Sequence, residues 1–160
     1  ITTVIGPNGS GKSTLLKIIS GDFEHTSAKV FYDNNPLSLI SLKRRAKIRS
    51  VMSQSQMIMF DYNVEDILSM GWLGFEIAEN LDVYEKVLVK IVDECAIKSL
   101  MDRKFNVLSG GEQRRVHFAR TLLQLNHEQK QTFNKYLLLD EPTANLDLRW
   151  EVRLLSLIHI

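Results

Sequence analysis

The chain has one cysteine, Cys95, among its 160 residues. A single thiol excludes an intrachain disulfide, and this usage is typical of a reducing cytoplasm. No apolar run approaches the roughly 18 residues of a membrane span, and no signal-peptide pattern opens the sequence. The formal net charge of +1 gives no general attraction to nucleic acid or to an acidic surface. We therefore expect a globular domain with a buried core, which reaches any membrane only through a partner.

A phosphate-binding loop is predicted after the apolar run of residues 1–5. A strand, a glycine-rich turn and the start of a helix follow one another there. Glycines let successive backbone N–H groups curl toward a phosphate, and the helix N-terminus adds partial positive charge. Lys12 supplies a full charge for the β- and γ-phosphates, and Ser13 offers a hydroxyl ligand for Mg²⁺. The nucleoside-triphosphate site is predicted at Gly6, Pro7, Asn8, Gly9, Ser10, Gly11, Lys12, Ser13 and Thr14.

The chain from this loop to about residue 100 predicts an α/β domain that contains a helical insert. A helix from Ser13 to Gly21 is followed by a short β segment at 29–32. A basic run, 43–49, is interpreted as a solvated helix face rather than a nucleic-acid site. A short strand then ends at Gln54, and helical periodicity runs from the capping Asn63 onward.

A second anion-binding helix terminus is predicted at Leu108–Gln113. Ser109 can cap the helix that follows, and Gly110 and Gly111 leave its N–H groups accessible. Two phosphate-type sites in one domain are explained if the second serves a γ-phosphate held by another copy of the chain.

Two carboxylates end the apolar stretch Lys135–Leu139. This pattern predicts a buried parallel strand that delivers acids at its C-terminal end, where open α/β sheets bind ligands. Asp140 can hold Mg²⁺ through water, and Glu141 can orient and deprotonate an attacking water.

These motifs, in this order, resemble those of the nucleotide-binding subunits of ATP-binding-cassette (ABC) transporters. The resemblance covers nearly the whole chain and implies an α/β P-loop ATPase fold with a parallel sheet. Its RecA-like core would comprise residues 1–56 and 106–160, with a helical subdomain at about 57–105, and we expect sequence to be missing at both ends. The matching motifs are Gly6–Thr14 (Walker A), Gln54 (Q-loop), Leu108–Gln113 (signature), Leu137–Glu141 (Walker B) and Ala144–Asp147 (D-loop).

Within this family the chain resembles the importer ATPases for iron chelates, haem and cobalamin, and among these the haem importer subunit. The similar stretches are 45–71, the helix that begins at 108–116, and an extended connection at 126–134. A ferric-siderophore or cobalamin importer is the alternative, and a soluble ribosome-associated ABC ATPase is a second one. A DNA-repair ATPase is disfavoured, because no sustained heptads separate Lys12 from Ser109.

The resemblance also implies a mechanism and partners. Two copies would face each other head to tail, hydrolyse ATP and drive a membrane permease from the cytoplasmic face of the bacterial inner membrane. A periplasmic or surface substrate-binding protein would take part indirectly, and no nucleic acid is expected. The implied roles are Lys12, Gln54 and Glu141 in catalysis, Ser13, Gln54 and Asp140 around Mg²⁺, Ser109, Gly110, Gly111, Glu112 and Gln113 toward the partner's ATP, and Asp147 at the dimer seam.

Two elements of the family lie outside this sequence. The aromatic residue that stacks on adenine would precede Ile1, and the switch histidine would come well after Asp147, so His159 is not assigned that role. We therefore expect the 160-residue piece to hydrolyse ATP feebly or not at all, and the complete subunit to be active.

Overall fold

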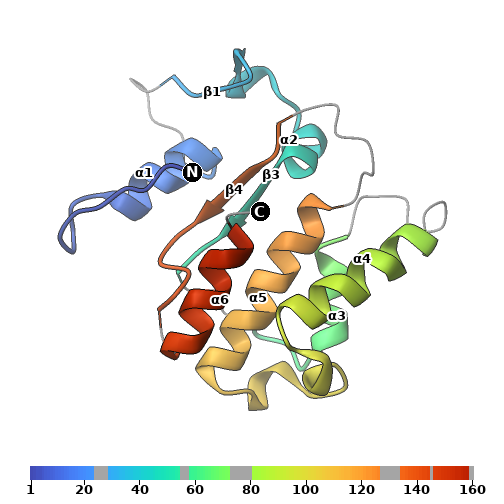
Figure 1. Cartoon of the computed structure of the whole chain (residues 1–160). Helices are drawn as coiled ribbons and strands as arrows, with labels where there is room; N and C mark the ends of the chain where they lie inside the picture. The colour runs from blue at the N-terminus through green and yellow to red at the C-terminus, as the bar shows by residue number, and fades with distance from the viewer. Residues whose placement is uncertain (24–28, 55–57, 73–80, 127–133, 145, 159–160) are drawn as a thin grey trace.

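The fold is a mixture of helices with a short parallel sheet (Figure 1). The computed structural model describes residues 1–23, 29–54, 58–72, 81–126, 134–144 and 146–158. In Figure 1, α1 lies on one side of the β3–β4 pair, and α5 and α6 lie on the other. The helices are α1 (Lys12–Ser20), α2 (Leu42–Ile48), α3 (Val64–Met70), α4 (Leu81–Glu94), α5 (Gly110–Leu125) and α6 (Leu148–Ile158), with strands β1 (Phe31–Tyr32), β2 (Asn35–Pro36), β3 (Arg49–Met52) and β4 (Tyr136–Leu139) and 3-10 turns at Leu37–Leu39, Lys98–Leu100 and Phe105–Val107.

Strands β3 and β4 pair in parallel, with Met52 opposite Leu139. One further backbone bond continues the ladder, since Asp140 N–H donates to Met52 O at 2.9 Å. Parallel pairing brings the carboxyl ends of both strands to the same edge, and Gln54 and Glu141 follow there. The predicted parallel strand before the acids is thus confirmed, although β4 is half-buried rather than fully buried.

The strand predicted at residues 1–5 is not formed. Its apolar side chains are exposed, Ile5 by 90% and Ile1 by 81%. A strand needs a neighbour to satisfy its backbone N–H and C=O groups, and no described strand runs beside this segment. Local sequence pattern predicted the strand, but the ladder that would stabilise it is a long-range feature.

Helix α5 is the centre of the helical layer, in contact with α2, α3, α4 and β3. The helical insert predicted after Asn63 takes the form of α3 and α4, and residues 73–80 between them lie outside the described part of the chain. Trp72 is fully buried, with its ring edge-on to Tyr84 at 5.2 Å. Asn63 begins α3 with the predicted cap, which Asp66 completes as a capping box.

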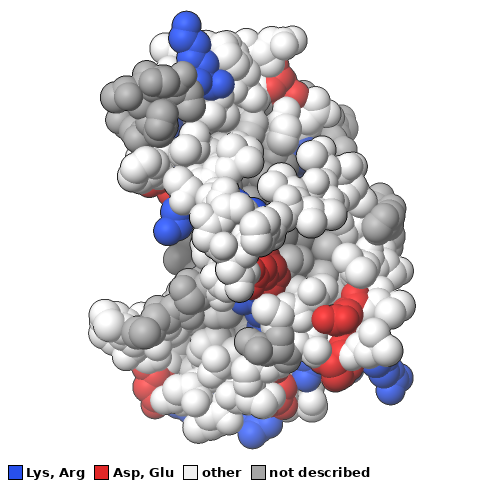
Figure 2. All heavy atoms as spheres, turned by 90° about the vertical axis from the view of Figure 1, so that its left-hand side faces the viewer, with Lys and Arg blue, Asp and Glu red and all other residues white. Residues whose placement is uncertain are grey.

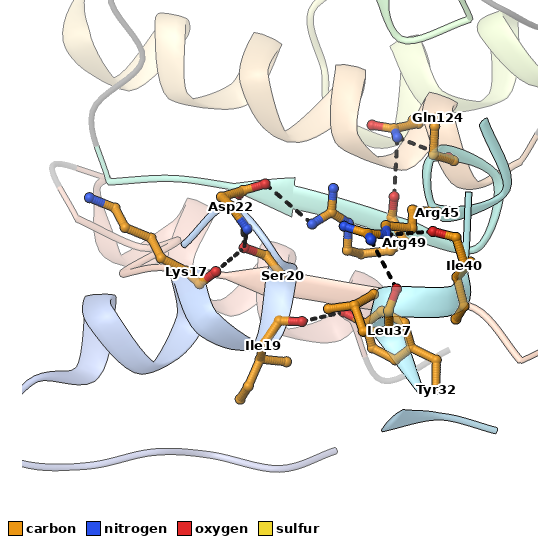
Figure 3. A network of polar contacts seen from close by, with 11 residues as sticks. Lys17, Ile19, Ser20, Asp22, Tyr32, Leu37, Ile40, Arg45, Arg49 and Gln124 are labelled. Atoms are coloured by element: carbon orange, nitrogen blue, oxygen red, sulfur yellow. Dashed lines mark hydrogen bonds and ion pairs between the residues drawn. The ribbon is translucent and has the colours of Figure 1, made fainter. Parts of the chain in front are cut away.

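Polar bonds attach α1 and the residues after it to β1 and β3 (Figure 3). The Tyr32 hydroxyl donates to Ile19 O at 2.8 Å, and Arg49 pairs with Asp22 at 3.4 Å. Arg45 donates to two backbone carbonyls of the preceding turn, at 2.8 and 2.9 Å. The interpretation of the basic run, 43–49, as a solvated face is therefore wrong for Arg45 and Arg49, which are half-buried structural donors.

Candidate nucleotide site

The loop before α1 has the backbone shape predicted for a phosphate cradle. Gly9 and Gly11 have φ of +78° and +91°, a region that residues with a Cβ rarely adopt. An added Cβ at either position would meet nothing within 4 Å, so the space beside the loop is open. Lys12 Nζ donates to Gly6 O and Pro7 O, each at 2.9 Å, and so holds the loop closed over the start of α1. A phosphate oxygen would offer the same ammonium an anionic acceptor instead.

The ends of β3 and β4 bring Gln54 and Glu141 together, although 87 residues separate them in the sequence. Gln54 Nε2 donates to Glu141 Oε2 at 2.7 Å. Asp140 lies immediately before Glu141, with its backbone fixed to the end of β3. The structure thus places the predicted Q-loop amide and the predicted base in direct contact at the carboxyl edge of the sheet.

Glu141 has a backbone conformation that a side chain disfavours. Its φ is +47°, within the left-handed region. For a non-glycine residue this costs about 1–3 kcal/mol and persists only where neighbours enforce it. Such outliers gather at functional sites, which fits the role predicted for this carboxylate.

Arg114 is a site-edge residue that the sequence interpretation missed. Its side chain is 9% exposed, and the guanidinium donates to Gln54 O at 2.6 Å, to Asp140 O at 3.0 Å and to Glu141 O. Nε lies 3.4 Å from Pro142 O. Burial lowers the pKa of Arg114, whereas the nearby Glu141 and Asp140 carboxylates raise it. Nothing in the residues around Arg114 indicates its hydrogen-bond acceptors, because these lie 26 to 60 residues away in the sequence.

Ser109 caps α5 as predicted. Its hydroxyl accepts from Glu112 N–H at 3.3 Å, and Glu112 Oε2 accepts from Ser109 N–H at 2.8 Å, so the two form a capping box. The pKa of Glu112 is lowered first by the bond from the Ser109 N–H and then by the bond that the Ser109 hydroxyl donates to Glu112 Oε2 at 2.8 Å. Gln113 donates to Phe105 O and Leu108 O. Glu112 and Gln113 thus shape the signature loop within their own chain, and their role toward a partner's ATP stays a prediction.

Asp147 begins α6. Its carboxylate accepts from Trp150 N–H at 3.0 Å. Two guanidinium groups lie over the Trp150 ring, that of Arg115 at 4.5 Å and that of Arg153 at 5.1 Å from its centroid. Arg115 comes from the helix that begins at Ser109, so the ring joins the two segments predicted to face the second copy. Asn145, within the predicted D-loop, lies outside the described residues.

The predicted residues gather in two sets. Gln54, Asp140 and Glu141 meet at the sheet edge, while Lys12 and Ser13 lie on α1 at the phosphate loop. Figure 2 shows the left-hand face of Figure 1, which is indented between an upper and a lower part and has acidic atoms near the middle of the view. Within the described ranges, no three His, Cys, Asp or Glu side chains gather as a metal cluster. Mg²⁺ commonly takes only one or two carboxylates and completes its shell with water and phosphate oxygens, so the hard oxygens of Ser13, Gln54 and Asp140 suit it.

Comparison with known families gives a match to the ABC transporter family over residues 1–144. The chain belongs to this family. Its ATPase domain implies ATP binding, and the family resemblance found in the motifs is thereby confirmed. Across the described residues, no helix combines the length and apolar character needed to cross a membrane.

Similar proteins include several hemin import ATP-binding proteins named HmuV. The one from Nitrobacter winogradskyi is 39% identical over 98% of this chain and 57% of its own length. That of Agrobacterium fabrum is 34% identical over 98% of this chain and 58% of its own length. The chain therefore spans a little over half the length of these ABC family relatives.

Solved structures of ABC proteins share the fold. One is cbiO1 from Clostridium perfringens, described as part of the ABC transporter complex cbiONQ, with a TM-score of 0.71 and 28% identity over 96% of this chain and 59% of that one. An ATP-binding subunit of an ABC transporter has a TM-score of 0.78 at 21% identity, over 96% of this chain and 60% of that one, and supports the fold alone. The predicted P-loop ATPase fold class is confirmed.

Proposed function

We propose that this chain is part of the ATP-hydrolysing subunit of an ABC importer for haem or a related iron chelate. The observation that carries the ATPase assignment is the contact between the Gln54 amide and the Glu141 carboxylate at the carboxyl edge of the sheet. The relatives named for hemin import support the choice of cargo.

In this proposal the side chains of the site divide the work, and Gln54 has two tasks. Lys12 and the N–H groups of Gly6–Thr14 bind the β- and γ-phosphates, where a full charge and aligned dipoles act together. Glu141 accepts the proton of the attacking water, and Gln54 orients that water. Mg²⁺, which Ser13, Gln54 and Asp140 would hold, supplies charge neutralisation of the phosphates. Gln54 first has to release Glu141, because its amide now occupies one oxygen of the base.

The proposed site is shared by two copies. Ser109 and Gly110 are exposed at the start of α5. The capping box occupies the N–H groups of Ser109 and Glu112, so the N–H groups of Gly110 and Gly111 are the ones proposed to bind a ligand outside the chain. Placed against the partner's γ-phosphate, they would complete a site of which Lys12 supplies the other half. Asp147, exposed at the start of α6, would lie at the seam.

In this proposal the helical insert and the rest of the chain have different roles. Residues 1–56 and 106–160 would form the ATPase core, and about 57–105 the helical subdomain. Closure on ATP would move this subdomain against a permease, and hydrolysis would release it. The subunit would thus lie peripherally on the cytoplasmic face of the membrane, with a substrate-binding protein acting through the permease.

Transport in vesicles tests both the activity and the cargo. The complete subunit and its permease are reconstituted, ATP is supplied, and uptake of haem, a ferric siderophore and cobalamin is compared. We expect haem uptake that stops when Glu141→Gln removes the base. Uptake of a siderophore or cobalamin alone would overturn the cargo assignment, and ATP-independent uptake would overturn the ATPase assignment.

A further inference from the structure

One guanidinium joins the two segments that carry Gln54 and Glu141, two of the predicted catalytic side chains. Arg114 of α5 donates to the backbone carbonyl of Gln54 after β3, and to those of Asp140 and Glu141 after β4. The segments lie 60 residues before and 26 to 27 residues after Arg114 in the sequence. The bonds to backbone oxygen leave the Gln54 and Glu141 side chains free to bind each other or a substrate.

We propose that Arg114 is the positioning residue that fixes the backbone of Gln54 relative to that of Glu141, so that both side chains start from the right place for hydrolysis. The inference rests on the proposed ATPase function. Arg114 touches neither nucleotide nor water in this proposal, and it acts through the backbone of the two residues that do.

The chemistry of the side chain suits this task. A guanidinium has five N–H donors in a rigid plane and stays protonated, so it can bond several carbonyls at fixed mutual angles. A lysine ammonium is a point charge on a flexible stem and would not fix two backbone segments relative to each other. At 9% exposure, Arg114 also has little water to compete for its donors.

Arg114 can hold Glu141 in its unusual backbone conformation. Glu141 holds a φ of +47°, and its own carbonyl is one of the oxygens that Arg114 bonds. Without this bond the peptide is free to relax to an ordinary conformation. The carboxylate would then move from the Gln54 amide, which lies 2.7 Å away.

The test compares Arg114→Gln and Arg114→Lys with wild type in the complete subunit bound to its permease. ATP turnover is measured against ATP concentration, and hydrogen exchange is followed over residues 49–54 and 136–144. We expect kcat to fall about tenfold to a hundredfold, the scale of misplacement by about an ångström. The KM for ATP should change little, because Lys12 and the phosphate loop lie on other elements. Exchange should quicken at the Asp140 amide, with Arg114→Lys intermediate.

Arg45→Gln is the matched control. Arg45 is a half-buried arginine that, like Arg114, donates to backbone carbonyls, but these belong to Leu37 and Ile40, far along the chain from the acids. Its loss should quicken exchange near residues 37–42 and leave kcat unchanged. Unchanged kcat in Arg114→Gln would overturn the proposal. So would faster exchange throughout the protein, including α3, because that marks a general loss of stability. If wild type itself hydrolyses no ATP, the proposed function fails, while the exchange pattern still decides whether Arg114 fixes the two segments.

Discussion

Alanine substitutions at two glycines, Gly71 and Gly110, should separate an effect on stability from an effect on ATP turnover. At Gly110, the first residue of α5, an added Cβ would meet nothing within 4 Å. At Gly71, just after α3, it would lie 2.6 Å from Arg120 O and 3.1 Å from Leu68 O. Both residues lie next to a helix, so the substitution Gly→Ala has a similar effect on the unfolded chain at each. The surroundings alone should decide the result.

For Gly110→Ala we expect a stable protein that does not hydrolyse ATP. Alanine restricts the unfolded chain, which stabilises the fold by about 0.4–1 kcal/mol and raises Tm by about 1–4 °C. The new methyl group would stand where a partner's γ-phosphate has to approach the helix N-terminus. Loss of such a preorganised donor costs about 2.7–4 kcal/mol, so turnover should fall about a hundredfold to a thousandfold.

For Gly71→Ala we expect the opposite pattern. The Arg120 carbonyl belongs to the backbone of α5 and cannot rotate away, so the helices must separate. Overpacking of this kind costs about 1–3 kcal/mol, and after the gain in the unfolded chain the net loss is about 1–2 kcal/mol. Tm should fall by about 2–8 °C. Turnover measured well below that temperature should stay close to wild type.

Both variants are assayed in the complete subunit with its permease, by thermal unfolding and by phosphate release. Wild-type turnover in Gly110→Ala would refute the reasoning that this helix start approaches a phosphate. A lower Tm in Gly110→Ala would show that the open space beside it is filled within its own chain.

Three further predictions concern the fold. The pKa of Glu112 lies below its ordinary value of 4.5, so its capping bonds stabilise the protein fully above pH 4.5. This stabilisation is lost as the pH falls through the lowered pKa. When the free energy of unfolding is measured against pH in acid, Glu112→Gln should therefore lose less stability than wild type. Burial raises the pKa of the Cys95 thiol to about 12, so a thiol reagent at pH 8 should react at least about tenfold faster after denaturation. Trp72→Ala should cost about 3–5 kcal/mol in urea unfolding, because the side chain is fully buried, and a loss below about 1 kcal/mol would contradict its place in the core.

Short-range signals in the sequence predicted much of the site. The turn glycines before Lys12 and the cap at Ser109 each depend on neighbours within a few residues, and the structure forms both locally. The strand before the acids was also predicted from its apolar pattern, although it forms by pairing with β3, far away in the sequence. Long-range features escaped the sequence. Arg114 finds its acceptors across tens of residues, and Arg45 bonds carbonyls that its basic neighbours gave no reason to expect.

At residues 1–5 the sequence predicted an element that the structure does not form. The apolar pattern there predicted a strand, yet the strand depends on a neighbouring ladder that a local pattern does not supply. The shared site likewise depends on contacts between two copies, which a local pattern in one chain does not supply.

Mixing two inactive variants tests the shared site most directly. In the complete subunit, Lys12→Ala removes the phosphate-binding half of the site and Gly110→Ala blocks the half offered to the partner. In a head-to-tail mixed dimer, the Lys12 of one copy and the Gly110 of the other still meet in one intact site. We predict that each variant alone is inactive and that mixing them restores ATP hydrolysis. A mixture as inactive as its components would contradict the account.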